Sequence, residues 1–115
     1  MDAISSIIIN KALDGLSMRA LATAQNIAGA SSPRYKPLQV KFEESLKAAA
    51  AKGPEAVRDL PLAITRATQS GFGDEPRLDL ELSTAASTAS RYGALLNLLG
   101  REMQIERIAV QGGQS

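Results

Sequence analysis

Apolar residues recur at alternating steps of three and four near both ends of this chain, and the middle has no such pattern. The first series is Ile9, Leu13, Leu16, Ala20, Thr23 and Ile27. The second runs through Leu82, Ala85, Ala89, Tyr92, Leu96, Leu99, Met103, Glu106 and Val110. Alternating steps of this kind keep one narrow seam of a helix facing a partner helix. The sequence therefore predicts an all-α fold in which long N-terminal and C-terminal helices pair as a coiled coil, with an extended or flexible middle segment.

The N-terminal helix is expected over residues 4–28, with Ser5 or Ser6 as its cap. Gly29, followed by Pro33, is the usual order of residues at a helix end. Gly15 lies inside this helix, where a glycine costs about 1 kcal/mol relative to alanine. Two interpretations of Gly15 stay open: a glycine that packing tolerates, or a site where a neighbouring segment approaches closely.

The middle of the chain is interrupted by prolines and glycines. Pro33 and Pro37 bias residues 33–40 toward a loop or a short extended arm. A short helix is predicted from about 42 to 51, and residues 52–77 are predicted as a flexible linker. Alternation of Leu60, Leu62 and Ile64 leaves a short hairpin as the alternative. We interpret Gly71-Phe72-Gly73 as a turn, because no phosphate-loop Lys-Ser/Thr follows it.

The C-terminal helix is expected to begin near Leu78 or Leu82 and to end before Gly112-Gly113. Acidic Asp79 and Glu81 suit its first turn. Gly93 and Gly100 stand seven residues apart on one face, either as a groove for a neighbouring helix or as tolerated surface glycines. The chain thus divides into residues 1–51, 52–77 and 78–115, which together form one discontinuous helical domain.

The amino-acid composition makes several classes of function unexpected for this chain. Aromatic residues make up only 3% of the chain, which favours thin helix-on-helix contacts and a marginally stable monomer. The net charge is +1 and the charges are dispersed, so nucleic acid is not an expected partner. The chain has no His and no Cys, and its carboxylate clusters lie in polar segments. We therefore expect no catalytic residues, no metal site, no cofactor and no small-molecule substrate.

No segment has the length and composition of a cleavable signal peptide or of a membrane span. Asp2 stands where a signal needs positive charge, and the apolar run Ile7-Ile8-Ile9 is short. If the protein leaves the cytoplasm, it is expected to do so without a cleavable signal.

One segment carries a family resemblance: Asn26-Ile27-Ala28-Gly29-Ala30-Ser31-Ser32-Pro33-Arg34-Tyr35-Lys36. It resembles the signature N-x-A-N-x-x-T-P-G-Y-K that follows the first helix of bacterial flagellar axial proteins. The closing portion, from residue 82 to the Gly112-Gly113 pair, is similar to the same family. Within it, the chain looks most like the rod proteins of the basal body, those of the proximal rod in particular. The similarity covers roughly residues 5–50 and 78–113.

The segment departs from this signature at three positions. Gly29 replaces the second Asn, Ser32 replaces Thr, and Arg34 replaces a Gly that takes positive φ without steric cost. Arginine does not adopt positive φ cheaply, so we expect a different turn geometry here.

The resemblance implies a structural, non-enzymatic subunit of the flagellar basal body, located in the periplasmic rod. Its partners would be other rod subunits, rod-base proteins and the flagellar type III export apparatus. Asn26, Pro33, Tyr35 and Lys36 would shape the turn. The helix-packing and assembly residues would be Leu13, Leu16, Ile27, Leu82, Tyr92, Leu96, Leu99 and Met103.

Two alternatives stay open. The first is a small helical adaptor or export chaperone that binds one partner through the same seams. The second is an amphipathic helix on a membrane surface, which Lys11 and Arg19 would support only weakly.

Overall fold

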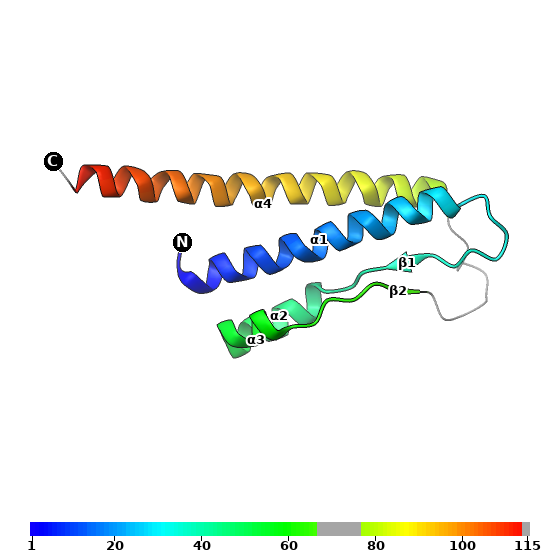
Figure 1. The fold of residues 1–115 in the computed structure, drawn as a ribbon, viewed down its shortest axis with the longest axis horizontal. Helices are drawn as coiled ribbons and strands as arrows, with labels where there is room; N and C mark the ends of the chain where they lie inside the picture. Colours follow the sequence, from blue (N-terminus) through cyan, green and yellow to red (C-terminus); the bar gives the residue numbers. More distant parts are fainter. Residues whose placement is uncertain (67–76, 114–115) are drawn as a thin grey trace.

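The computed structural model describes residues 1–66 and 77–113. In chain order the elements are α1 (Ala3–Gly29), β1 (Leu38–Gln39), α2 (Glu43–Lys52), α3 (Pro54–Asp59), β2 (Thr65–Arg66) and α4 (Leu78–Gly112). The long helices α1 and α4 run antiparallel side by side, and α2, α3 and the two strands form a second layer on the other side of α1 (Figure 1). The fold is therefore mostly helical with long helices at both ends, as predicted.

Both long helices lie within a few residues of their expected bounds. The start of α1 differs in detail, because Asp2, and not Ser5 or Ser6, is the cap. Its carboxylate accepts a hydrogen bond from the Ser5 backbone N–H at 2.8 Å. This bond satisfies one of the free N–H groups of the first turn. α1 ends at Gly29 as predicted, and α2 lies within one residue of the expected 42–51.

The expected linker over 52–77 is wrong in its first half. Pro54 begins α3, a position where proline suits a helix, and β2 pairs antiparallel with β1 in the register Leu38 with Arg66 and Gln39 with Thr65. Leu60, Leu62 and Ile64 pack against the core. The hairpin alternative is wrong as well, because residues 60–64 form no strand and α2 and α3 separate β1 from β2 in the chain. The rest of that linker, with the Gly71-Phe72-Gly73 turn, lies outside the described residues.

The core lies between α1 and this second layer. It consists of the buried residues Leu16, Ala22, Val40, Phe42, Leu46, Ala49 and Val57. Val57 is fully buried, so the short α3 is anchored to the core by one apolar side chain. The seam of α1 is therefore covered by this chain's own middle segment as well as by α4.

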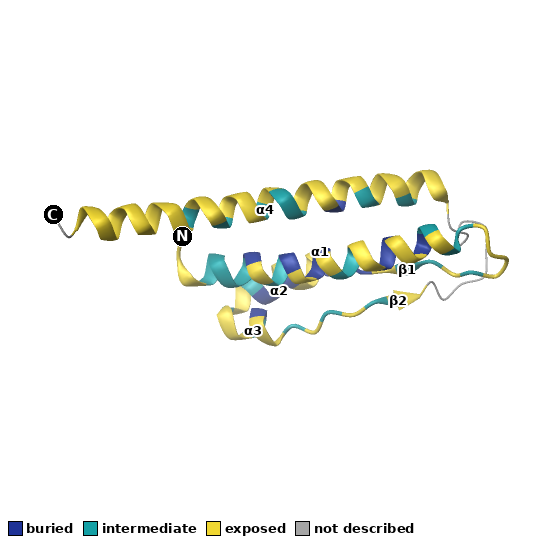
Figure 2. Ribbon diagram, turned by 45° about the horizontal axis from the view of Figure 1, so that its top comes forward, coloured by how far each residue is buried: buried dark blue, intermediate teal, exposed yellow. Residues whose placement is uncertain are grey.

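The whole molecule is elongated, with extents of 66 × 28 × 14 Å and a radius of gyration of 18.0 Å. A compact domain of this length would have a radius of gyration of about 13 Å. α4 extends beyond the start of α1, so its last turns have no helix beside them (Figure 1). Much of α4 is consequently exposed, as the yellow colour of most of its ribbon in Figure 2 shows.

Candidate assembly surface and motif turn

Asn26 connects α1, the following turn, β1 and α4. Its amide Nδ2 donates to the Leu38 carbonyl at 2.8 Å and to Glu81 Oε2 at 3.2 Å. Its Oδ1 accepts from the Leu38 N–H at 2.8 Å and from the Tyr35 hydroxyl at 2.9 Å. The side chain is 2% exposed, so these four bonds replace the water it would otherwise bind. Asn26 therefore fixes how the chain leaves α1.

The turn itself is held by Tyr35. Its ring lies against Gly29, where an added Cβ would stand 2.6 Å from ring atoms. The guanidinium of Arg66 lies over the same ring, 5.7 Å from its centroid, and donates to the Lys36 carbonyl at 3.1 Å. Pro33 and Lys36 are both exposed. The hydrogen bond from Arg66 goes to the backbone carbonyl of Lys36 and not to its side chain. Of the four predicted turn residues, the structure brings Asn26 and Tyr35 together.

Arg34 adopts φ of +69°, a left-handed conformation that glycine takes without steric cost. The expectation that arginine would avoid positive φ at this position is therefore wrong. Four hydrogen bonds at Asn26 and the packed Tyr35 ring fix both sides of the turn, and such contacts hold a non-glycine residue in an unfavourable conformation.

Gly15 allows a close approach between α1 and Phe42. An added Cβ at Gly15 would stand 2.6 Å from atoms of the Phe42 ring. The guanidinium of Arg19 lies 4.9 Å from the centroid of the same ring and donates to both carboxylate oxygens of Glu43 and to the Val40 carbonyl. These hydrogen bonds lower the pKa of Glu43 to about 2. Of the two interpretations of Gly15, the close approach is the correct one.

The predicted packing residues divide into two groups. Leu13 and Leu16 are buried, and Ile27, Tyr92 and Leu99 are partly buried. The other three lie on the outside of α4: Leu82 (53% exposed), Leu96 (46%) and Met103 (58%). Ala20 of the first series is exposed as well. The sequence therefore located the helices correctly but misplaced part of the seam between them.

The residues of α4 with reduced exposure at alternating steps of four and three are Glu81, Ala85, Thr88, Tyr92, Leu95, Leu99 and Glu102. This series shares Ala85, Tyr92 and Leu99 with the predicted one. The residue before each of Leu82, Ala89, Leu96 and Met103 takes the place of that predicted residue, and the observed series ends at Glu102. Three of the four missed positions are polar. Glu81 bonds to Asn26, and Glu102 forms an ion pair with the Met1 amine at 2.7 Å and raises its pKa. Hydrophobicity cannot reveal such positions, because their partners lie far away in the sequence.

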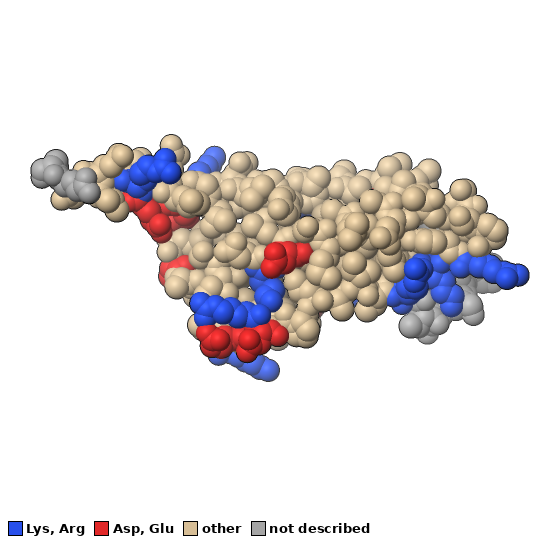
Figure 3. All heavy atoms as spheres, viewed as in Figure 1, with Lys and Arg blue, Asp and Glu red and all other residues tan. Residues whose placement is uncertain are grey.

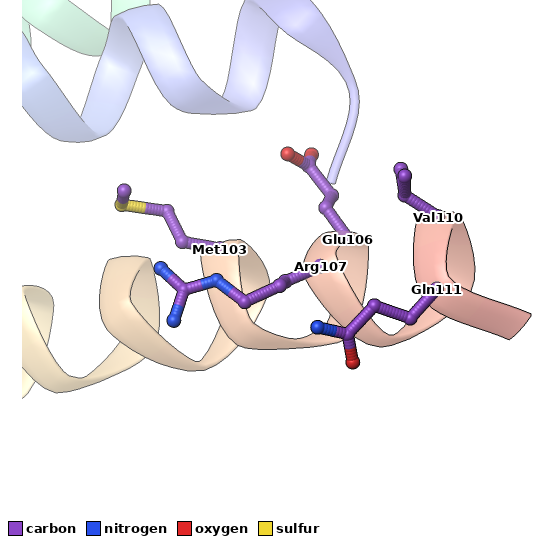
Figure 4. Close-up of a pocket in the computed structure, with 5 residues that line it drawn as sticks. All are labelled: Met103, Glu106, Arg107, Val110 and Gln111. Carbon is purple, nitrogen blue, oxygen red and sulfur yellow. The ribbon is translucent and has the colours of Figure 1, made fainter.

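α4 has an exposed surface whose large apolar residues lie in two stripes on different sides of the helix. Beyond Leu82, Leu96 and Met103, its exposed large apolar residues are Leu78, Leu80, Leu98, Ile105, Ile108 and Val110. On the face drawn in Figure 3, charged side chains gather at the two ends of the molecule and on the α2–α3 layer, and the middle of α4 has none. Figure 4 shows the last turns, where Glu106 points toward the start of α1 and Val110 extends one turn further. This surface is the candidate functional site.

Within the described ranges, no cluster of three or more acidic side chains has the arrangement of a metal site. No described helix is long and apolar enough to cross a membrane. No family model matches the chain, and no curated protein matches it.

Proposed function

We propose that this chain is a structural subunit of the bacterial flagellar basal body, in the proximal rod. The proposal joins the motif resemblance at residues 26–36 to one observation, the uncovered apolar surface that runs along α4. In this proposal α1 and α4 pair as a coiled coil within each subunit, and the outer surface of α4 contacts neighbouring rod and rod-base subunits.

The composition of α4 around its axis supports an assembly role. Only one longitudinal row is uniformly polar and uncharged: Ser83, Ser90, Asn97, Gln104 and Gln111. Most other rows carry Leu, Ile, Met, Val or Ala. Large apolar residues that stay exposed on several sides of a long helix are suited to contacts with other proteins. α1 covers only one side of α4, so the remaining sides suit protein neighbours.

We also propose that the chain reaches the periplasmic rod through the flagellar type III export apparatus. The chain has no Cys, and α3 and the two strands are short elements with few core side chains. Unfolding for export would therefore break no disulfide, and contacts with neighbouring subunits would compensate the ordering cost afterwards.

Leu96→Asp tests this function. Leu96 is 46% exposed and lies outside the seam that faces α1, so a charge there should leave the monomer folded and disrupt contacts with neighbours. The expected result is loss of swimming and loss of the subunit from purified basal bodies. The matched control is Asn97→Asp, which places the same charge one residue further on, in the polar row. Normal swimming and normal incorporation of Leu96→Asp would contradict the proposal.

A second candidate is an adaptor or export chaperone that binds one partner through α4. The packed core around Val57 favours it, because this core lets the isolated chain fold without neighbours. An adaptor should be absent from purified basal bodies and should copurify with one partner in a soluble complex of fixed stoichiometry. A rod subunit should show the opposite distribution.

A further inference from the structure

The outer side of α4 carries a second regular series, separate from the seam against α1. Every seventh residue from Leu82 forms one row: Leu82, Ala89, Leu96, Met103 and Val110, all exposed. A row of small residues lies beside it: Ala86, Gly93 and Gly100. Together the rows step by four and three, which is the spacing of a helix–helix seam. This outer seam lies about a quarter of a turn around α4 from the one that faces α1.

The small row leaves room for another backbone. A Cβ added at Gly93 or at Gly100 would meet no atom within 4 Å, so nothing among the described residues occupies this space. Small residues in a seam allow two helices to approach closely. The row of large residues spans 28 positions, or about 42 Å of helix. An occupant must therefore be a straight helix of about that length with an apolar seam of its own.

We propose that two copies of this chain form an antiparallel dimer through their outer seams. α4 has the required length, at 35 residues, and the other long helix, α1, is already covered on two sides. When two copies of α4 run antiparallel with opposed residue numbers summing to 189, the two large residues in the middle of the row meet small residues, and Leu82 and Val110 at its ends lie opposite Arg107 and Asp79. Leu96 then lies opposite Gly93, Met103 opposite Ala86, and Ala89 opposite Gly100 of the second copy.

The charged residues near the ends of the outer seam also favour the antiparallel orientation. In the antiparallel pair, Arg107 lies beside Leu82 of the second copy, one turn from Asp79, so opposite charges meet at both ends of the seam. A parallel pair in register would place Arg107 against Arg107 and Gly100 against Gly100, which combines like-charge repulsion with unfilled space. The antiparallel pair is therefore favoured by the fit of Leu96 and Met103 against small residues and by charge.

One face of one helix is a small contact for a protein–protein interface. We therefore expect a reversible dimer with a Kd of roughly 10–100 μM, which corresponds to a modest binding free energy. The inference concerns the isolated chain and does not rest on a role in the flagellum.

Sedimentation equilibrium of the purified chain between about 1 and 500 μM tests the dimer. The expected result is a monomer–dimer equilibrium that Gly100→Leu weakens at least tenfold, since the larger side chain prevents close approach. Gly100 is exposed within the helix, so this change should leave the fold intact, which circular dichroism checks. Ala94→Leu, which adds the same side chain on another exposed face, is the control and should leave Kd within twofold.

Spin labels test the orientation. The chain has no Cys, so Gln111→Cys takes a single label outside the outer seam. Antiparallel helices would separate the two labels by about 50 Å, and parallel helices by about 10–15 Å. A purely monomeric chain at 500 μM, an unchanged Kd in Gly100→Leu, or a short label distance would each overturn the inference. Swimming and basal-body incorporation bear on the proposed function alone, so the two proposals can fail separately.

Discussion

Replacement of Asn26 by alanine should destabilise the fold more than any exposed substitution. Asn26 is 2% exposed, and its removal leaves the N–H and the carbonyl of Leu38 without their partner, together with the Tyr35 hydroxyl. A buried polar group without a partner costs about 1–3 kcal/mol. Leu38 is partly buried, so we expect the two backbone groups to reduce the free energy of unfolding by roughly 2–4 kcal/mol. For a chain of this size the melting temperature should fall by about 10–25 °C.

Urea unfolding followed by circular dichroism measures this loss. Asn97→Ala is the matched control, because Asn97 is exposed on α4 and should change the free energy of unfolding by no more than about 0.5 kcal/mol. Asn26→Asp refines the test: it keeps both acceptor bonds, loses both donor bonds and places a carboxylate beside Glu81. Its destabilisation should therefore shrink as pH falls and one carboxyl is protonated. An Asn26→Ala variant as stable as Asn97→Ala would refute this reasoning.

Three further changes test other contacts. Gly15→Ala should lower the urea midpoint despite the better helix propensity of alanine, because overpacking against Phe42 costs about 1–3 kcal/mol; an unchanged or higher midpoint would contradict the close approach. Since the pKa of Glu43 falls from 4.5 to about 2 on folding, its contribution is complete above pH 4.5 and is lost toward pH 2. Arg19→Met should reduce the difference between urea midpoints at pH 6 and pH 3, and an undiminished difference would argue against the ion pair. Leu95→Ala should cost about 2 kcal/mol in urea unfolding and Leu96→Ala about 0.5 kcal/mol or less, because Leu95 packs against the core and Leu96 is exposed; equal costs would refute the observed register.

The helices were predictable because their signals are local. The apolar spacing lies within each helix, and Gly29 and Pro33 lie at or just after the end of α1. The observed bounds of α1 and α4 are close to the expected ones. The middle was harder, since α3 and the two strands depend on contacts across the fold. Val57, for example, lies in a six-residue helix too short to show an apolar period, and contacts with the distant core explain its burial.

The register of α4 shows where the pattern itself is ambiguous. The residues Ala85, Tyr92 and Leu99 belong to two seams at once, one completed by Leu82, Leu96 and Met103 and the other by Glu81, Thr88 and Leu95. Hydrophobicity favours the first seam, but Asn26 of α1 offers a buried amide that Glu81 can reach, and Leu82 cannot use it. Hydrogen bonding between distant residues thus selects the second seam for α1. The residues that only the first seam contains, Leu82, Leu96 and Met103, remain exposed on α4, where they are available to another helix.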